Sequence, residues 1–511
     1  MTETANRKRL LMIAAVMGIF MLTETLYMYR HYGASAFGIM AVTANLIMFV
    51  GLLTGFIGHY LCGWKTENVY LAFGIAMGLV FLIIFPIYVV PDEPVHLNTA
   101  YELSNRLMGV GTSPDGVYYR ACDRTLPVTV KYTIGLFNEY YGHLFEPTGN
   151  TELILRNDGT VATMFYQYIP GALGITLGRL LNLNTLTTFL LGRLFTLACF
   201  VTLIYFAIKL LPVGKMVLMV VALTPMMLQQ GMSYSYDWFL NSISILITVF
   251  TVRIMLAKKE GQPVRRAEYI VLAVLSVLLL PLKGKVYFAI SLMPWILILM
   301  PEKPMSAKYK SILKKFAYTL IVLIAVFTVY RYFAGGQLLE EPENIISFAE
   351  LQGYTPQFFI NKPYELIFVL KQTFFQYGMS LFSSCIGDNF GWLEINLYTP
   401  VLYMLYAALF LTAVKNRDEK SYFTGKQKAW VLACSGIAIC SVFGAMLLRY
   451  SPVGWAIMGV QGRYFIPTEL AVLLAVRGNW ITKYSKVDQY SLFIMIAAVN
   501  LTANLLIMYY S

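Results

Sequence analysis

The chain has 511 residues, of which 58% are hydrophobic and only 13% are charged. Soluble domains carry about 25% charged residues, so this composition excludes a soluble globular protein and indicates a chain that crosses a membrane several times. The formal net charge is +12, but most lysines and arginines fall in short loops between apolar runs, which the positive-inside rule explains without a nucleic-acid partner.

Apolar runs of about 20 residues predict an all-α polytopic membrane protein with about thirteen transmembrane helices, give or take two. The first two helices lie within residues 1–67, and basic residues 7–9 place the N-terminus in the cytoplasm. The remaining helices form the main transmembrane domain, residues 68–511. We place the spans at 10–29, 37–62, 68–90, 186–208, 216–231, 238–257, two shorter helices within 269–300, then 316–333, 396–414, 429–448, 464–476 and 490–510.

Two long segments should stay on the outer side of the membrane. The first, residues 91–165, is polar and far longer than an ordinary loop, and an interfacial or re-entrant helix should follow it up to residue 183. The second is 334–395. Its apolar part, 364–386, must lie on the membrane or dip into it for the next basic loop to be cytoplasmic. If 364–386 spans instead, the sidedness of everything after it reverses.

The most distinctive stretch is Pro91-Asp92-Glu93-Pro94-Val95-His96, which follows the apolar run 68–90. Proline lacks an N–H and restricts the residue before it, so the helix should end here. The stretch then presents two carboxylates at the membrane surface, where either could act as a general base. A single acid there could also cap a helix or be solvated, but the pairing favours a functional interpretation.

The other polar clusters fall on the same expected side, whereas the cytoplasmic loops hold plain lysines and arginines. This pattern predicts chemistry at the outer membrane face, in which acids act as bases and cations hold an anionic leaving group. The clusters are Tyr166 to Tyr168, Tyr234 to Asp237, Lys283 to Lys285, Gly387 to Glu394 and Gln461 to Tyr464.

Short motifs in these clusters resemble a bacterial family of polytopic membrane proteins, domain of unknown function 2142. The resemblance covers residues 68 to 480, so the first two helices look like an addition. Its motifs are Pro91-Asp92-Glu93-x-x-His96, Tyr166-x-Tyr168-Ile169-Pro170, Gly178-Arg179, Gly192-Arg193, Ser235-Tyr236-Asp237, Lys285-x-Tyr287, Gly391-Trp392-Leu393 and Gly459-Val460-Gln461-Gly462-Arg463-Tyr464-Phe465-x-Pro467.

That family in turn resembles the C-type (GT-C) glycosyltransferases, which take a sugar from a polyprenyl-phosphate donor at the outer membrane face. The resemblance implies an inverting transferase acting on a cell-envelope glycan or glycopolymer. Asp92 would be the catalytic base, and Glu93 would orient it or the acceptor. The donor phosphate would be held by Arg463 and by Lys285 or Lys283. Weaker substrate-binding candidates are His96, Tyr168, Asp237, Trp392, Glu394, Gln461 and Tyr464.

No cofactor or metal is required by this resemblance, because the lipid phosphate already has basic partners; a divalent cation stays possible. The implied partners are the lipid-linked sugar donor, the envelope glycan acceptor and membrane lipids, with no nucleic acid.

Each candidate also has a structural interpretation. Both lysines could snorkel to lipid headgroups, and Asp237 could cap a helix. His96 could hydrogen-bond within its loop, Trp392 and Tyr464 could belong to an aromatic belt with Arg463 beside them, and Glu394 could be solvated. We interpret Arg179 and Arg193 as headgroup anchors.

Two other functions fit the composition. A lipid-linked saccharide transporter or flippase predicts ionisable groups along a path through the bilayer. A non-catalytic scaffold of an envelope-polymer assembly complex predicts that changes at Asp92 and Arg463 are harmless while truncations are not.

Overall fold

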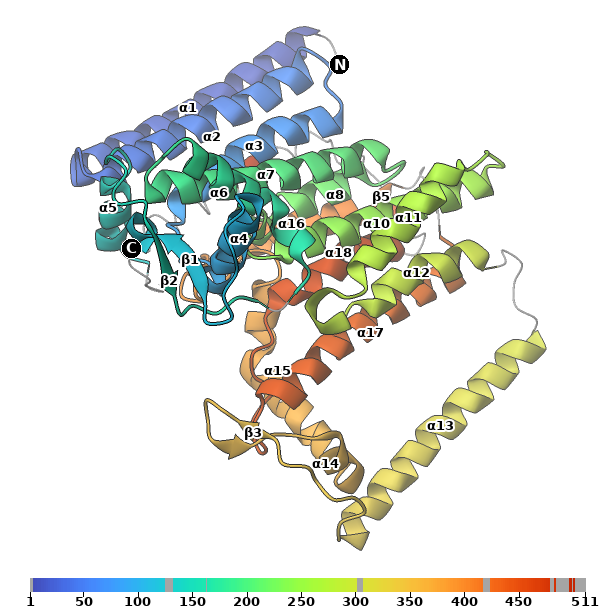
Figure 1. The fold of residues 1–511 in the computed structure, drawn as a ribbon. Coiled ribbons are helices and arrows are strands. Elements are labelled where there is room, and N and C mark those ends of the chain that lie inside the picture. The colour runs from blue at the N-terminus through green and yellow to red at the C-terminus, as the bar shows by residue number, and fades with distance from the viewer. Residues whose placement is uncertain are drawn as a thin grey trace.

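A computed structural model shows the fold (Figure 1) and describes residues 3–124, 132–161, 163–300, 307–416, 423–477, 482–483, 496–498 and 500. Helices dominate these ranges, and the strands form only three two-stranded sheets. Among the described residues, seven helices are long and apolar enough to cross a membrane, or eight if one bent pair counts as a span. The predicted class, an all-α polytopic membrane protein, is therefore confirmed.

The first three helices, α1 (Glu3–Tyr32), α2 (Ala36–Tyr60) and α3 (Thr66–Ile84), lie side by side along one edge of the molecule (Figure 1). Small residues allow the close contact of α2 with α3, since a Cβ added at Gly51 would lie 2.0 Å from the Cβ of Ala76. This use of small residues is typical of helix pairs in membranes. On its other side α3 packs against α7 (Thr185–Leu210).

The segment after α3 is folded rather than extended. It contains α4 (Glu93–Leu107), β1 (Val117–Arg120), η1 (Ala121–Arg124), α5 (Ile134–Gly142) and β2 (Leu153–Arg156). The two strands pair antiparallel, with Val117 opposite Arg156. A short turn η2 (Phe165–Tyr168) then leads into α6 (Ile169–Leu180), which packs along α7 at Gly174 and Gly178.

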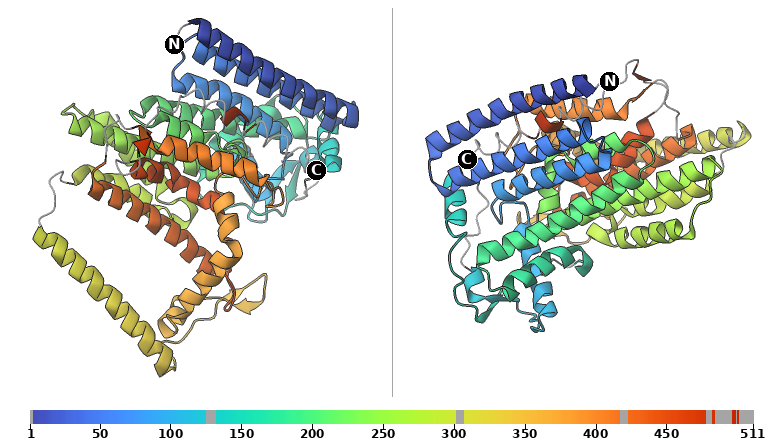
Figure 2. Two further views of the ribbon diagram at one scale, coloured as in Figure 1. Left: turned by 180° about the vertical axis from the view of Figure 1, so that it is seen from behind. Right: turned by 90° about the horizontal axis from the view of Figure 1, so that it is seen from above.

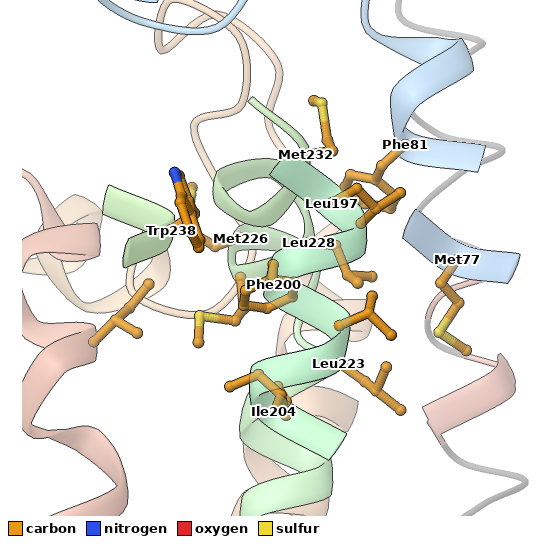
Figure 3. Packing of buried hydrophobic residues seen from close by; sticks show 14 of the residues in the cluster. Met77, Phe81, Leu197, Phe200, Ile204, Leu223, Met226, Leu228, Met232 and Trp238 are labelled. Carbon is orange, nitrogen blue, oxygen red and sulfur yellow. The ribbon is translucent and has the colours of Figure 1, made fainter. Parts of the chain in front are cut away.

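The centre of the bundle is formed by α7 with α8 (Lys215–Ala222), α9 (Pro225–Met232), α10 (Asp237–Lys259) and α18 (Ile466–Val476). We expected a single span at 216–231, which is wrong in detail, because α8 and α9 meet at 66°. Pro225 occupies the first turn of α9, and proline starts helices more readily than it continues them. Figure 3 shows the apolar side chains of α3, α7 and α9 that fill this region.

The predicted break within 269–300 is confirmed. The chain forms α11 (Arg266–Leu279), the 3₁₀ turn η3 (Leu282–Lys285) and α12 (Phe288–Leu299). These helices, like α16 (Thr399–Ala413) and α18, have 11 to 15 residues, fewer than the roughly 20 that cross a bilayer. The count of about thirteen spans therefore includes four short helices. Most of the expected span 490–510 lies outside the described residues.

An arm of the molecule begins with α13 (Ala307–Ala334), which contains the expected span 316–333 and stands apart from the bundle in two opposite views (Figures 1 and 2). The arm continues through β3 (Ile345–Ile346), β4 (Leu351–Gln352) and α14 (Pro356–Asn361) to α15 (Glu365–Ser383). As expected for 364–386, α15 is not among the helices apolar enough to span. The fold is completed by β5 (Lys415–Asn416), α17 (Gly425–Tyr450), η4 (Gly462–Phe465) and β6 (Thr482–Lys483).

Candidate functional site

The turn that carries the two adjacent acids starts earlier than expected. Helix α3 ends at Ile84, not near residue 90, because Pro86 disfavours helical backbone at Phe85, whose φ and ψ are −110° and 100°. Pro94, which we expected to follow a helix end, instead lies in the first turn of α4. The chain between α3 and α4 is therefore a tight turn that ends at Asp92.

Strained backbone gathers around this turn. Eight non-glycine residues among those described have positive φ, and six of them belong to three loops that meet near Asp92. Such residues cost about 1–3 kcal/mol each and persist only where the surroundings hold them, as they often do at functional sites. The six are Tyr88, Asp92, Lys283, Lys285, Asn389 and Leu393.

The two adjacent acids occupy opposite environments. The side chain of Asp92 is 60% exposed, whereas that of Glu93 is completely buried. The left-handed backbone of Asp92, with φ of 61°, turns its side chain outward while the next residue starts α4 and points inward. The surface therefore presents one carboxylate, not two.

Glu93 is held by a full set of donors. Its Oε2 accepts hydrogen bonds from the Tyr88 backbone N–H (2.9 Å) and from Arg193 Nη2 (2.5 Å), and its Oε1 accepts from Arg193 Nε (2.8 Å) and the Tyr234 N–H (3.3 Å). Arg193 also donates to the carbonyl oxygens of Phe85 and Pro86. This buried pair ties α7 to the turn and fixes the backbone that precedes Asp92.

Arg193 is therefore not a headgroup anchor, which corrects the interpretation from the sequence; its side chain is fully buried. Arg179 is likewise buried: its Nη1 donates to Ser104 Oγ (3.0 Å) and Asn105 Oδ1 (2.9 Å), and its guanidinium stacks on the Tyr101 ring. The only sequence signal for such a buried arginine is a single arginine within an apolar run. That signal does not show whether the guanidinium binds a partner inside the protein or a lipid phosphate.

A second charged group lies where four distant segments meet. Arg463 Nη2 is 3.6 Å from Asp92 Oδ2, and Arg463 Nε is 3.8 Å from Asp237 Oδ2. Lys283 Nζ donates to Asp237 Oδ1 at 2.8 Å. We call these four residues the charged cluster. The N-cap of α10 is Tyr236, and Asp237 follows it in the first turn, where its carboxylate lies beside the two cations.

Arg463 is buried but incompletely paired. Its side chain is 5% exposed, both of its carboxylate neighbours lie beyond normal hydrogen-bond distance, and its Nε has no hydrogen-bond partner among the described residues. A buried donor without a partner is costly and calls for an explanation such as a ligand or water. Arg463 also borders a cavity of about 10 Å³, beside Gln229, Gln461 and Ser384, which is about the space of one water.

Both candidate lysines lie in the kinked turn η3, which places them in different environments. Lys283 points inward, with its ammonium 3.7 Å from the centre of the Tyr464 ring. Burial opposes the charged form, but Asp237 and the nearby tyrosines outweigh it and raise the pKa of Lys283. Lys285 is exposed. The structure thus brings Lys283, not Lys285, into the charged cluster.

We expect Lys283→Met to weaken the binding of an anionic ligand by roughly tenfold or more, because a desolvated cation is lost beside Arg463. Lys285→Met is the matched control and should change it by less than about twofold, since the removed charge is exposed. Titration of each purified variant with inorganic phosphate would measure this. Equal losses in both variants would contradict the assignment of Lys283.

His96 lies on the inner face of α4, next to the charged cluster. Its Nδ1 is 2.7 Å from the hydroxyl oxygen of Tyr168, and its ring meets the edge of Tyr236 at 4.9 Å between centroids. Burial lowers the pKa of His96 to about 4, although Asp237 opposes this shift. The imidazole is therefore neutral at physiological pH, and it positions Tyr168 rather than carrying charge.

This pKa predicts a pH dependence of stability. Between about pH 6.5 and 4 the unfolded chain binds a proton at His96 and the folded chain does not, so stability falls as the pH falls, by up to about 3 kcal/mol. Thermal unfolding of the detergent-solubilised protein should show that acidification lowers the stability of His96→Gln less than that of the wild type. The exposed His143 supplies the control variant, His143→Gln; identical slopes in all three proteins would contradict the prediction.

Of the remaining candidates, some support the structure of the site and one lies on the surface. Trp392 Nε1 donates to the carbonyl oxygen of Tyr88 (2.9 Å) and so braces the turn that carries Asp92. Tyr464 lies under Lys283, and its carbonyl oxygen accepts from the Tyr287 hydroxyl (2.7 Å). Gln461 borders the small cavity with an unpaired Oε1. Glu394 is exposed and does not join the cluster.

Within the described ranges, no three histidine, cysteine, aspartate or glutamate side chains are grouped so that they could hold a metal ion. The cations of the charged cluster could neutralise an anionic group directly.

The fold and this site define a polytopic helical membrane protein with a charged cluster of two acids and two cations, one of the acids being the exposed Asp92. Residues 75–474 match the family described as predicted membrane protein (DUF2142). The chain therefore belongs to that family, and the match begins within α3, so α1 and α2 lie outside it. No curated protein and no solved structure matches the chain.

Proposed function

We propose that this protein is a membrane-embedded glycosyltransferase. It would move a sugar from a polyprenyl-phosphate donor to a cell-envelope glycan or glycopolymer on the outer face of the membrane. The observation that carries the proposal is the juxtaposition of a buried, incompletely paired Arg463 with the exposed carboxylate of Asp92. The first is suited to an anionic leaving group and the second to a proton.

The chemistry follows from these positions. Asp92 takes the proton of an acceptor hydroxyl, and the oxygen attacks the anomeric carbon of the donor sugar. The bond from that carbon to the phosphate oxygen breaks, so polyprenyl phosphate leaves with the electron pair and the configuration inverts. Arg463 and Lys283 offset the negative charge that grows on the leaving phosphate. Glu93 acts through the backbone, because its carboxylate is occupied by Arg193.

The charge balance supports a phosphate ligand. The charged cluster holds two acids and two cations, but Lys283 binds Asp237 tightly while Arg463 stays beyond hydrogen-bond distance of both carboxylates. A phosphate beside Arg463 could replace these long contacts with direct charge-assisted hydrogen bonds. The cavity beside Arg463 is too small for a sugar, so the donor would have to enter from the exposed side, where Asp92 lies.

Lipid-facing surface is available for the donor's tail. Only 6% of the apolar window of α13 is buried within the structure, and Leu320, Val326 and Val329 are among the residues that this helix exposes. These side chains would contact lipid, and a polyprenyl chain is a lipid of the same apolar character.

The test is donor turnover by the purified protein in proteoliposomes. Polyprenyl-phosphate sugars would be supplied singly with envelope glycan fractions, and release of polyprenyl phosphate would be followed together with sugar incorporation. We expect turnover with at least one donor. Movement of intact donor between leaflets without turnover would support the flippase alternative and overturn the proposal. A folded protein that neither turns over nor moves any donor would point to a scaffold.

A further inference from the structure

A separate cavity lies farther along α15, outside the charged cluster. Its volume is about 320 Å³, which is within the range of small-molecule sites. One wall is a face of α15, and the other is the loop that follows α17. The lining residues are Gln372, Gln376, Tyr377, Gly454, Trp455, Ala456 and Met458.

We propose that this cavity binds a neutral saccharide of the acceptor glycan; this inference rests on the proposed function. The lining offers two amide side chains, a phenol and an indole, and it includes no charged residue. Each amide presents both a donor and an acceptor, as a sugar hydroxyl requires. The indole presents an apolar face for the C–H groups of a sugar ring together with an N–H donor.

The polar groups of the lining are available to a ligand. Gln372, Gln376 and Trp455 are exposed. The two glutamines are four residues apart on a helix, so their side chains neighbour each other on one face. A phosphate or carboxylate would find no cation there, which is why we assign a neutral saccharide rather than the donor phosphate.

The loop that forms the second wall is firmly held. The Ile457 N–H donates to Thr373 Oγ1 of α15 (2.9 Å), and the Gly454 N–H donates to the Tyr354 hydroxyl (2.9 Å). The Met458 N–H donates to Ser451 Oγ (3.0 Å). Because these bonds fix the loop from three sides, the cavity exists before any ligand arrives, which lowers the ordering cost of binding.

The two segments that line the cavity both continue toward Arg463 of the charged cluster. Ser384 directly follows α15, and its Oγ accepts a hydrogen bond from the Gly462 N–H, next to Arg463. Gln376 precedes Ser384 by eight residues, about 12 Å along a helix at 1.5 Å per residue. A glycan lying along α15 could therefore place one sugar in the cavity while a sugar farther along reaches Asp92.

The test is binding of the full-length protein, in lipid nanodiscs, to an immobilised panel of neutral and uronate-containing oligosaccharides. The wild type should retain neutral glycans in preference to uronate-containing ones. Trp455→Ala, and Gln372→Ala combined with Gln376→Ala, should lower retention at least about tenfold. Trp455→Phe keeps an aromatic face and should lose less. Phe375→Ala is the control, because that ring is 84% exposed on α15 and does not line the cavity.

Two results would overturn the assignment: a wild type that retains no neutral glycan, or Trp455 and glutamine variants that bind as the wild type does. Failure of the proposed function would give a different experimental result. Glycan retention that depends on Trp455, in a protein that turns over no donor, leaves the saccharide site standing and removes the transferase. Conversely, turnover that requires Asp92 but has an acceptor KM indifferent to Trp455 removes only this site.

Discussion

Asp92→Asn is expected to lower sugar transfer by about 10²–10⁴-fold, the usual contribution of a positioned general base. The amide cannot accept the acceptor proton, so the loss should appear in kcat. The KM for the donor should not rise, because the substitution removes an acid beside Arg463 and leaves that cation freer to hold phosphate. Steady-state kinetics with a labelled polyprenyl-phosphate sugar would separate the two constants.

Asp92→Asn should leave the backbone at this position unchanged. Asp92 has a left-handed backbone, with φ of 61°, and asparagine tolerates that conformation as readily as aspartate does. The change thus removes charge without adding backbone strain, which Asp92→Ala would not achieve. Asp115→Asn is the matched control, because Asp115 is another exposed acid of the segment 91–165. A well-folded Asp92→Asn protein with normal turnover would eliminate Asp92 as the base.

The meeting of Asp92, Asp237, Lys283 and Arg463 could be anticipated in part. Each belongs to a polar stretch at the end of an apolar run, and such ends fall at a membrane surface whatever the packing of the helices. The alternation of basic loops then predicted that these stretches share one side. Hydropathy does not specify which helices are neighbours, so the individual distances and the choice of Lys283 over Lys285 required the structure.

The errors have a common cause, which is that apolar composition does not reveal where a backbone bends. Residues 85–90 are as apolar as the helix before them, yet Pro86 ends α3 and the run continues as a buried turn. The same holds at Pro225, where an apolar run is split into two helices at 66°. A proline marks the bend in both places, although the hydropathy of the surrounding residues predicts a continuous helix.

The partners of the buried arginines cannot be predicted from the sequence, for a different reason. An arginine near the end of an apolar run can reach lipid headgroups or an internal carboxylate, and both satisfy its charge. Only packing decides between them. For Arg193 the deciding partner, Glu93, lies 100 residues earlier in the chain, and nothing local in the sequence connects the two.

Breaking that pair should produce the largest loss of stability. Glu93→Gln leaves the Arg193 guanidinium buried without its counter-charge, and removing one partner of a buried ion pair costs about 3–5 kcal/mol. Thermal unfolding of the solubilised protein would measure the loss. Where folded protein persists, kcat should fall as well, because Glu93 accepts from the Tyr88 N–H and so shapes the turn that presents Asp92.

Two further variants distinguish the buried Glu93–Arg193 ion pair from an exposed ion pair. Glu93→Gln combined with Arg193→Met leaves no lone charge, so it should be more stable than Glu93→Gln alone, and the double-mutant cycle should give a clear coupling energy. Glu102→Gln is the control on the same helix: its partner Arg106 is 60% exposed, and exposed pairs contribute only about 0–1 kcal/mol. Similar losses for Glu102→Gln and Glu93→Gln would show that the inner acid does not hold the turn, and the positioning of Asp92 would then need another explanation.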